Sequence, residues 1–229
     1  MIDFIHFNNG LELPIYRSED LDEYISRDML EGIIDWLDTA DALVLQKYQG
    51  ILMQKGDKVI LPNKLELTFE AAGVYSLVFT FETPKGKLVI KMPNKFNEDE
   101  AQEQYIPNYT LEFARITQMQ EELGDELKRY NVQLPKCVMA GTHVFIREYL
   151  EGEILDSSSK GDELSEAAGI VHSIEPLLLE WMEKKRKEKK NMNWENASLD
   201  LRDKIKRPSG KNFIKTENGE IFLIDPFIG

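Results

Sequence analysis

Three consecutive segments between residues 65 and 93 constrain the fold more than any other part of the chain. LELTFEA (65–71), YSLVFTFE (75–82) and LVIKMP (88–93) have the length of strands and either alternate apolar and polar residues or run apolar. The second and third are joined by PKGK (84–87), a tight turn that favours antiparallel pairing. The sequence therefore predicts a three-stranded antiparallel meander.

A helix, two more strands and a second helical region are expected after the meander. Residues 109–123 (YTLEFARITQMQEEL) have the apolar periodicity of an amphipathic helix. The segments 132–141 (VQLPKCVMAG) and 142–152 (THVFIREYLEG) have the pattern of strands. Residues 162–190 are helical in pattern, with Pro176 marking a kink or a new start.

The first 64 residues predict an accessory segment in front of the meander. Apolar residues recur at roughly helical spacing over residues 26–48, as one helix or as two, because DTAD (38–41) can cap a second one. ILMQKGDKVIL (51–61) predicts a hairpin that turns around Lys55-Gly56-Asp57.

The composition argues against several classes of protein. A chain of 229 residues has room for one large domain or two small lobes. It has no apolar run of about eighteen residues, so we expect no membrane span, and its start lacks a basic n-region, so we expect a cytoplasmic protein. Cys137 is the only cysteine, which excludes an intramolecular disulfide and a cysteine zinc cage. The net charge of −13 argues against nonspecific nucleic-acid binding.

One basic run, KKRKEKK (184–190), stands against this acidic background. We interpret it as the solvated C-terminal end of a helix, where cations suit the helix macrodipole. The alternative interpretation is a docking patch for an acidic partner.

Lys91 is the first candidate functional residue, because it interrupts an apolar strand. A charge is costly to bury without a partner, and Val89 on the same face of the strand has the character of a core residue. Glu112, near the start of the next helix, is the expected partner, with Glu103 as the alternative. A strand Lys paired with a helix Glu can hold the phosphates of a nucleotide. A solvent-facing lysine on an edge strand is the competing interpretation.

Small residues form the turn between the first two strands of the meander. Positions 71, 73, 76 and 78 follow the spacing G-x-G-x-x-G-x-V, although only the central glycine is present. Small side chains at this turn would let backbone N–H groups approach phosphate oxygens. Any hairpin also favours small residues at its turn.

Asn212 and Asp225 flank the closing hairpin, which turns at Asn218-Gly219. Because a hairpin brings its two ends together, we expect the Asn amide and the Asp carboxylate to face a common point. That pair of oxygen donors suits Mg²⁺, which takes few protein ligands together with phosphate oxygens. The alternative is that two polar residues bound a surface hairpin.

Taken together, these features resemble the protein-kinase-like superfamily. The resemblance runs from about residue 65 to the end of the sequence given and rests on the small-residue turn, the lysine of VIK, the helix glutamate, REYLEG and the spacing between Asn212 and Asp225. It implies ATP and Mg²⁺ as cofactors. The site residues that it implies are a phosphate-covering loop at Ala71, Gly73, Ser76 and Val78; the strand lysine Lys91 and its partner Glu112; an adenine-contacting hinge at Glu148, Tyr149 and Leu150; and the metal ligands Asn212 and Asp225.

The sequence departs from the family pattern at the expected catalytic base. Arg207 stands where the family has its catalytic Asp, but Leu201-Arg202-Asp203 resembles the H-R-D triplet with four residues inserted after it. Asp203 is therefore the expected base, with Asp200 as the fallback. The sequence ends at Gly229, so we expect neither an activation segment nor a peptide-docking platform.

The resemblance implies an α+β, two-lobed fold. Its expected parts are an accessory segment (1–64), an N-lobe with an antiparallel sheet and one helix (65–151), and a reduced, mainly helical C-lobe (152–229). The expected function is ATP-dependent phosphotransfer to a protein or a small hydroxyl compound, with a protein partner that completes or uses the reduced C-lobe. The alternatives are a pseudokinase that serves as a binding or regulatory module, and an interaction domain without a nucleotide cleft.

Overall fold

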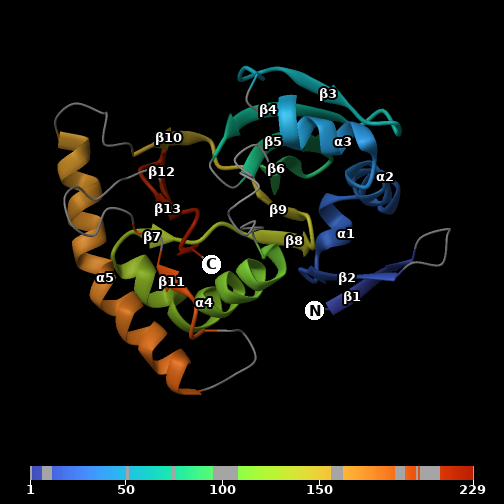
Figure 1. Cartoon of the computed structure of the whole chain (residues 1–229). Coiled ribbons are helices and arrows are strands. Elements are labelled where there is room, and N and C mark those ends of the chain that lie inside the picture. The colour runs from blue at the N-terminus through green and yellow to red at the C-terminus, as the bar shows by residue number, and fades with distance from the viewer. Residues whose placement is uncertain are drawn as a thin grey trace. The chain divides into compact units, whose positions relative to one another are not determined.

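The computed structural model describes residues 2–6, 12–49, 52–73, 76–94, 108–155, 162–188, 194–199, 201 and 212–228. The chain forms two compact units, whose helices and strands are labelled in Figure 1. The first unit consists of Met1–Phe113 and Lys136–Tyr149, and the second of Ala114–Pro135 and Leu150–Gly229. Helices and strands occur in both, so the expected α+β class is confirmed.

The first unit is built on an eight-stranded sheet in the order β1-β2-β8-β9-β6-β5-β4-β3. Every neighbouring pair in it is antiparallel. The expected meander is confirmed as β4, β5 and β6. The strands are β1 (Ile2–His6), β2 (Glu12–Arg17), β3 (Lys58–Ile60), β4 (Glu66–Ala72), β5 (Ser76–Thr83), β6 (Gly86–Pro93), β8 (Cys137–Gly141) and β9 (Val144–Glu148).

Helices from the N-terminal part of the chain cover one face of this sheet (Figure 1). The side chains of Ser26 and Thr39 accept hydrogen bonds from backbone N–H groups three residues later, so two separate helices begin there. The second of the two alternatives for residues 26–48 is therefore correct. The helices are α1 (Leu21–Tyr24), α2 (Arg27–Leu37) and α3 (Ala40–Val44), and a π-helical turn, Leu45–Gln49, follows.

The pleat of the central strands sorts their side chains between the two faces of the sheet. On β6, Leu88, Ile90 and Met92 belong to the core cluster that includes the residues of α1 to α3. Because successive side chains point to opposite faces, Val89 and Lys91 lie on the other face. The same alternation holds on the neighbouring strands β5 and β9, which contribute to that core Leu77, Phe79, Phe81, Val144 and Ile146.

The predicted hairpin over residues 51–61 is wrong. Residues 52–57 form turns, and β3 pairs with β4 instead. Gly56 adopts a φ of 97°, and its N–H donates to the carbonyl of Phe69 on β4, whose own N–H donates to Asp57. The turn is thus hydrogen-bonded to β4, which follows it in the sequence. The residues of the turn alone do not predict this pairing.

The second unit contains a four-stranded sheet, a two-stranded sheet, the long helix α5 and most of the long helix α4. α4 (Tyr109–Arg129) confirms the expected helix; it begins in the first unit and continues in the second. α5 spans Asp162–Glu188. The four-stranded sheet has the order β10-β12-β13-β7. The strands are β7 (Val132–Gln133), β10 (Gly152–Ile154), β11 (Ser198–Leu199), β12 (Phe213–Thr216), β13 (Ile221–Leu223) and β14 (Phe227–Ile228).

Two boundaries in the later part of the chain differ from the sequence prediction. The expected strand 132–141 is broken at Leu134-Pro135: β7 pairs in parallel with β13, whereas β8 pairs with β2 and β9. α5 continues through Pro176 without a new start. Pro176 lies on the exposed side of the helix, where water can satisfy the carbonyl group that loses its N–H partner.

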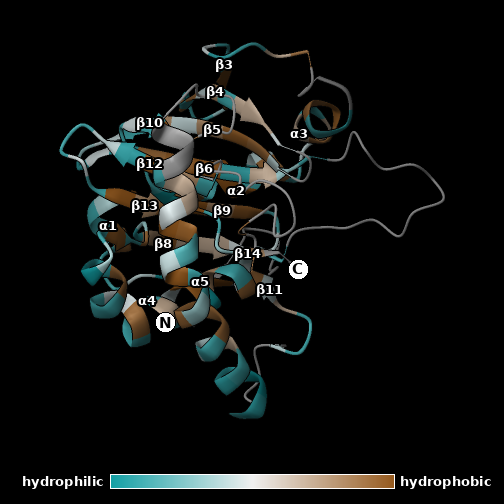
Figure 2. Cartoon of the chain, turned by 90° about the vertical axis from the view of Figure 1, so that its left-hand side faces the viewer, coloured by the Kyte–Doolittle hydropathy of each residue, from teal (hydrophilic) through white to brown (hydrophobic). Residues whose placement is uncertain are grey.

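Within the described residues, no helix has both the length and the apolar character required to cross a membrane. In Figure 2 the last turns of α5, which carry the basic run, have hydrophilic colours.

Replacing Ile33 by Ala tests whether the N-terminal helices are part of the first unit's core. Ile33 is fully buried against the sheet, whereas Ile60 on β3 is 69% exposed. We expect Ile33→Ala to lower the free energy of unfolding by about 2–5 kcal/mol, because it leaves a cavity, and Ile60→Ala to cost much less. Urea denaturation of both variants measures the difference. Equal effects would contradict the packing of α2 on the sheet.

Candidate functional site

Lys91 lies in the interior of the large sheet. Its strand, β6, is flanked by β5 and β9, and Lys91 is opposite Val78 on one side and Phe145 on the other. Only 6% of the residue is exposed. The interpretation of Lys91 as a solvent-facing lysine on an edge strand is therefore wrong.

Glu112 is the partner of Lys91, as expected from the sequence. Lys91 Nζ lies 3.6 Å from Glu112 Oε1, and the two side chains are 8% and 19% exposed. Glu112 stands in the first turn of α4, where the side chain of Asn108 accepts a hydrogen bond from the N–H of Leu111. The ammonium group also lies 5.5 Å from the centre of the Phe145 ring. A strand and a helix together hold the lysine head in place.

The small-residue turn leads from β4 into β5 beside Lys91. Its residues Val74 and Tyr75 lie outside the described part of the chain. The N–H of Gly73 donates to the carbonyl of Ser76, and the hydroxyl of Ser76 lies 2.8 Å from that of Tyr109 at the start of α4. Ala71 and Gly73 are exposed, and Val78 is half-buried opposite Lys91. The role of the turn toward phosphates stays a prediction.

The expected hinge, Glu148 to Leu150, uses some of its backbone groups within the first unit. The N–H groups of Glu148 and Tyr149 donate to the carbonyls of Lys136 and Lys87, at 3.0 and 3.2 Å. The ring of Tyr149 lies 4.3 Å from the ammonium of Lys87. Contacts between the hinge and a nucleotide base stay a prediction. A hydrogen bond from either of these two N–H groups to a base would have to replace its bond to the sheet.

The hairpin brings Asn212 and Asp225 together in the second unit, as predicted, but the contact is with the backbone of Asp225, so a common point for its carboxylate and the Asn amide stays a prediction. Asn212 donates from its amide nitrogen to the backbone carbonyl of Asp225 at 3.2 Å, and the N–H of Ile224 donates to the carbonyl of Asn212 at 2.8 Å. β12 and β13 pair between them, and Gly219 supplies the left-handed φ of 81° that the turn requires.

The donors of this pair fit a hard cation. A carboxylate and an amide oxygen are ligands that suit Mg²⁺, which needs few protein ligands when phosphate oxygens complete its shell. Over the described ranges, no group of three or more His, Cys, Asp or Glu residues forms a metal cage. The role of Asn212 and Asp225 as metal ligands stays a prediction.

The expected catalytic base lies outside the described residues. This holds for Asp203, for its fallback Asp200, and for Glu103, the alternative partner of Lys91. Their roles remain predictions.

Sequence reasoning missed a set of polar residues that share the face of Lys91. Glu70 on β4 accepts a hydrogen bond from Thr80 on β5 at 3.2 Å and pairs with Lys55 and Lys87. Burial opposes ionisation of Glu70, but the hydrogen bond and charge of Lys55 outweigh it and lower its pKa. Arg147 on β9 is also buried. These residues could have been predicted from the two-residue alternation of side chains that places Lys91 on one face of its strand, applied to the neighbouring strands as well.

Cys137 lies on β8 and is partly buried. Burial and the nearby charge of Glu112 raise the pKa of its thiol, which disfavours the reactive thiolate.

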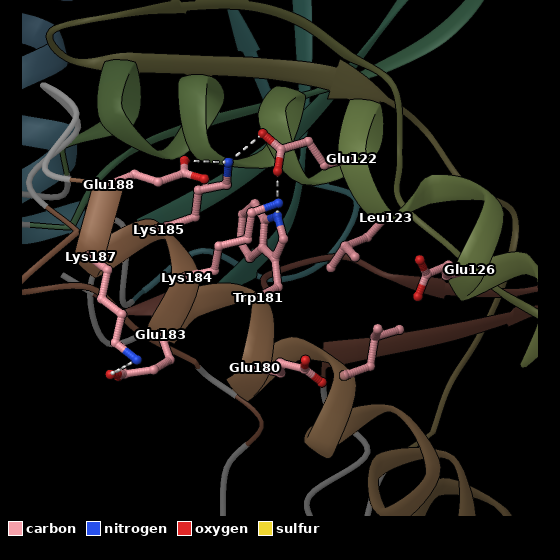
Figure 3. A pocket seen from close by; sticks show the side chains of 11 residues that line it. Glu122, Leu123, Glu126, Glu180, Trp181, Glu183, Lys184, Lys185, Lys187 and Glu188 are labelled. Carbon is pink, nitrogen blue, oxygen red and sulfur yellow. Dashed lines mark hydrogen bonds and ion pairs between the residues drawn. The ribbon is translucent and has the colours of Figure 1, made fainter.

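The basic run at the end of α5 binds groups of its own unit. Lys185, with 2% of its side chain exposed, pairs with Glu122 on α4 and with Glu188, beside a groove of about 960 Å³ (Figure 3). Arg186 donates to the carbonyl of Ala197 at 2.7 Å. Burial opposes ionisation of Glu122, but hydrogen bonds, first of all from Lys185, lower its pKa to about 2. The run lies at the end of α5, as interpreted, and Lys184, Arg186 and Lys187 are exposed. Lys185 is buried, so the interpretation of the run as solvated is wrong for this residue.

No protein-family model matches the chain, and no curated protein matches it significantly. The resemblance to the protein-kinase-like superfamily therefore depends on the residues described above.

Breaking the Lys91–Glu112 pair should destabilise the fold. We expect Lys91→Met or Glu112→Gln alone to cost about 3 kcal/mol, because each leaves a largely buried charge without its partner. The double variant should cost less than the sum of the two. The exposed pair Arg27–Glu31, joined at 2.7 Å, is the matched control and should show a coupling below about 1 kcal/mol. A double-mutant cycle in urea measures both couplings, and equal couplings would contradict the burial argument.

Proposed function

We propose that this protein is a kinase-like nucleotide-binding protein that transfers the terminal phosphoryl group of a nucleoside triphosphate to a hydroxyl group. By the resemblance, the nucleotide is ATP with Mg²⁺, and the acceptor is a protein or a small hydroxyl compound. The observation that carries the proposal is the buried Lys91–Glu112 pair on an interior strand.

The pair supports phosphate binding for an energetic reason. An ammonium group has three donors, so a lysine can bind a carboxylate and phosphate oxygens at the same time. The pair costs desolvation energy that an apolar pair of similar volume would avoid. Retaining it at the centre of a sheet is understandable if the lysine binds an anion, with Glu112 fixing its position.

In the second unit, Asn212 and Asp225 would hold the metal ion through their side-chain oxygens. The ion would neutralise charge on the phosphates of the nucleotide. Asp203 would accept the proton of the attacking hydroxyl. Phosphoryl transfer depends mainly on positioning and charge neutralisation, so these few side chains cover the main requirements of the reaction.

A pseudokinase is the second candidate, and specific contacts favour it. The hydroxyl of Ser76, in the expected phosphate-covering loop, lies 2.8 Å from that of Tyr109. The N–H groups of Glu148 and Tyr149 are bonded within the sheet. Both reduce the groups that this chain can offer to a nucleotide, which is consistent with a binding module that does not transfer phosphate.

Asp225→Asn tests nucleotide binding. We expect Mg²⁺ with ATP or GTP, tested in parallel, to stabilise the wild type by about 2.7 kcal/mol at a hundred times the dissociation constant. Asp225→Asn should lose the part of this stabilisation that depends on Mg²⁺, because the amide carries no charge. Glu217→Gln, at an exposed position of the same hairpin, should retain it. Thermal unfolding measures the shift, and a folded wild type that shows none with either nucleotide would refute the proposal.

Asp203→Asn separates transfer from binding. If Asp203 is the base, this variant should bind nucleotide like the wild type but lose phosphotransfer by a factor on the order of 10² to 10⁴. Nucleotide turnover, measured with and without candidate hydroxyl acceptors, reports the loss, and Asp200→Asn is the matched control. Nucleotide binding without any turnover in the wild type would favour the pseudokinase.

A further inference from the structure

Arg147 is a buried cation with few partners. It stands on the interior strand β9 and is 4% exposed. Its guanidinium makes one hydrogen bond, from Nη1 to the backbone carbonyl of Glu148 at 3.0 Å. Its Nε–H is buried and has no hydrogen-bond partner among the described residues. No carboxylate in the described part of the chain is within ion-pair distance of it.

The register of the sheet puts Arg147 on the same face as Lys91. Arg147 is opposite Val89, and Lys91 is opposite Phe145, so the two cations are diagonal neighbours on adjacent antiparallel strands. The carboxylates nearby have other partners. Glu112 pairs with Lys91, and Glu148, which the pleat points to the other face, accepts the N–H of Lys136 at 2.7 Å.

An uncompensated buried guanidinium requires an explanation. Lys91 is paired with Glu112, whereas among the described residues Arg147 has only part of its donor set satisfied and no carboxylate as an ion-pair partner. Such burial is strongly unfavourable in the protein alone, and removing the charge should relieve it. A ligand that offers acceptors in the plane of the guanidinium would compensate it.

We propose that Arg147 selects a guanine nucleotide in the proposed nucleotide site. This inference rests on the proposed function, because it takes Glu148 to Leu150 as the segment that contacts the base. Arg147 directly precedes that segment and is two residues along β9 from Phe145, the neighbour of Lys91. It therefore stands between the group assigned to the phosphates and the groups assigned to the base.

The chemistry of the two purines decides which base a guanidinium favours. Arginine has only donors, arranged in a planar fork. The O6 and N7 atoms of guanine are two adjacent acceptors that match this fork, whereas adenine offers N7 beside an amino group that is itself a donor. Pairing with adenine would therefore leave one donor opposed to another. Guanine satisfies the fork.

The experiment measures the affinities of the full-length wild type for Mg-GTP, Mg-ITP and Mg-ATP by calorimetric titration. ITP has the O6 and N7 atoms of GTP but lacks the 2-amino group, so it isolates the edge that Arg147 would contact. We expect GTP and ITP to bind more tightly than ATP by a factor on the order of 10 to 100. Arg147→Met should abolish this preference and leave the affinity for ATP unchanged or increased.

Two further variants test other roles of Arg147. Arg147→Lys keeps the positive charge but loses the planar fork, so it should also lose the preference for GTP and ITP over ATP. If Arg147 bound phosphate instead, the lysine would retain part of the affinity. Arg27→Met, which removes an exposed arginine on α2, should change nothing. Without nucleotide, Arg147→Met should melt at the same temperature as the wild type or higher, because it removes a buried charge. A large fall would show a structural role and overturn the inference.

The outcomes distinguish the inference from the proposed function. Equal affinities of the wild type for the three nucleotides, tighter binding of ATP, or an equal loss for all three in Arg147→Met would overturn guanine selection while nucleotide binding stands. A folded wild type that binds none of them would overturn the proposed function and this inference together.

Discussion

The two-residue alternation of side chains along β6 is the constraint on which the first unit depends. Leu88, Ile90 and Met92 point to one face and must be covered by apolar groups. Lys91 must then point to the other face, in the interior of a wide sheet where water is excluded. One strand thus requires both an apolar layer on one side and a paired charge on the other.

The N-terminal segment meets the first of these requirements. Its helices contribute Leu30, Ile33, Ile34 and Trp36 to the core cluster, and three of its strands belong to the sheet. Within the first unit, its helices cover the face of the sheet opposite to the one that carries Lys91. Other elements therefore cover the Lys91 face. The start of α4 supplies Glu112 and Tyr109 there. The accessory segment is therefore a structural part of the first unit.

What the sequence could predict depended on whether the signal was local. The meander, α4 and the closing hairpin follow from periodicity and turn residues in one stretch, and the pairing of Lys91 with Glu112 follows from the cost of a charge in an apolar strand. The turn at Gly56 binds a strand that comes later in the chain, so its pairing was missed. Arg147 was missed because an arginine at the end of a strand resembles a surface residue. Its strand lies in the interior of the eight-stranded sheet and the residue is 4% exposed, which the sequence around it does not reveal.

Three of the buried cations in the described part of the chain, Lys185, Lys91 and Arg147, differ in how far the protein compensates their charge. Lys185 has two carboxylates and lies near the ring of Trp181, so it needs nothing further and holds α5 to α4. Lys91 is paired with Glu112. Within the described ranges, the guanidinium of Arg147 donates to one acceptor, the backbone carbonyl of Glu148. A protein selected for stability alone would replace the least compensated cation first, because an apolar residue of similar size would cost less. The proposal of a ligand for this face of the sheet rests on this difference between Arg147 and the better compensated cations.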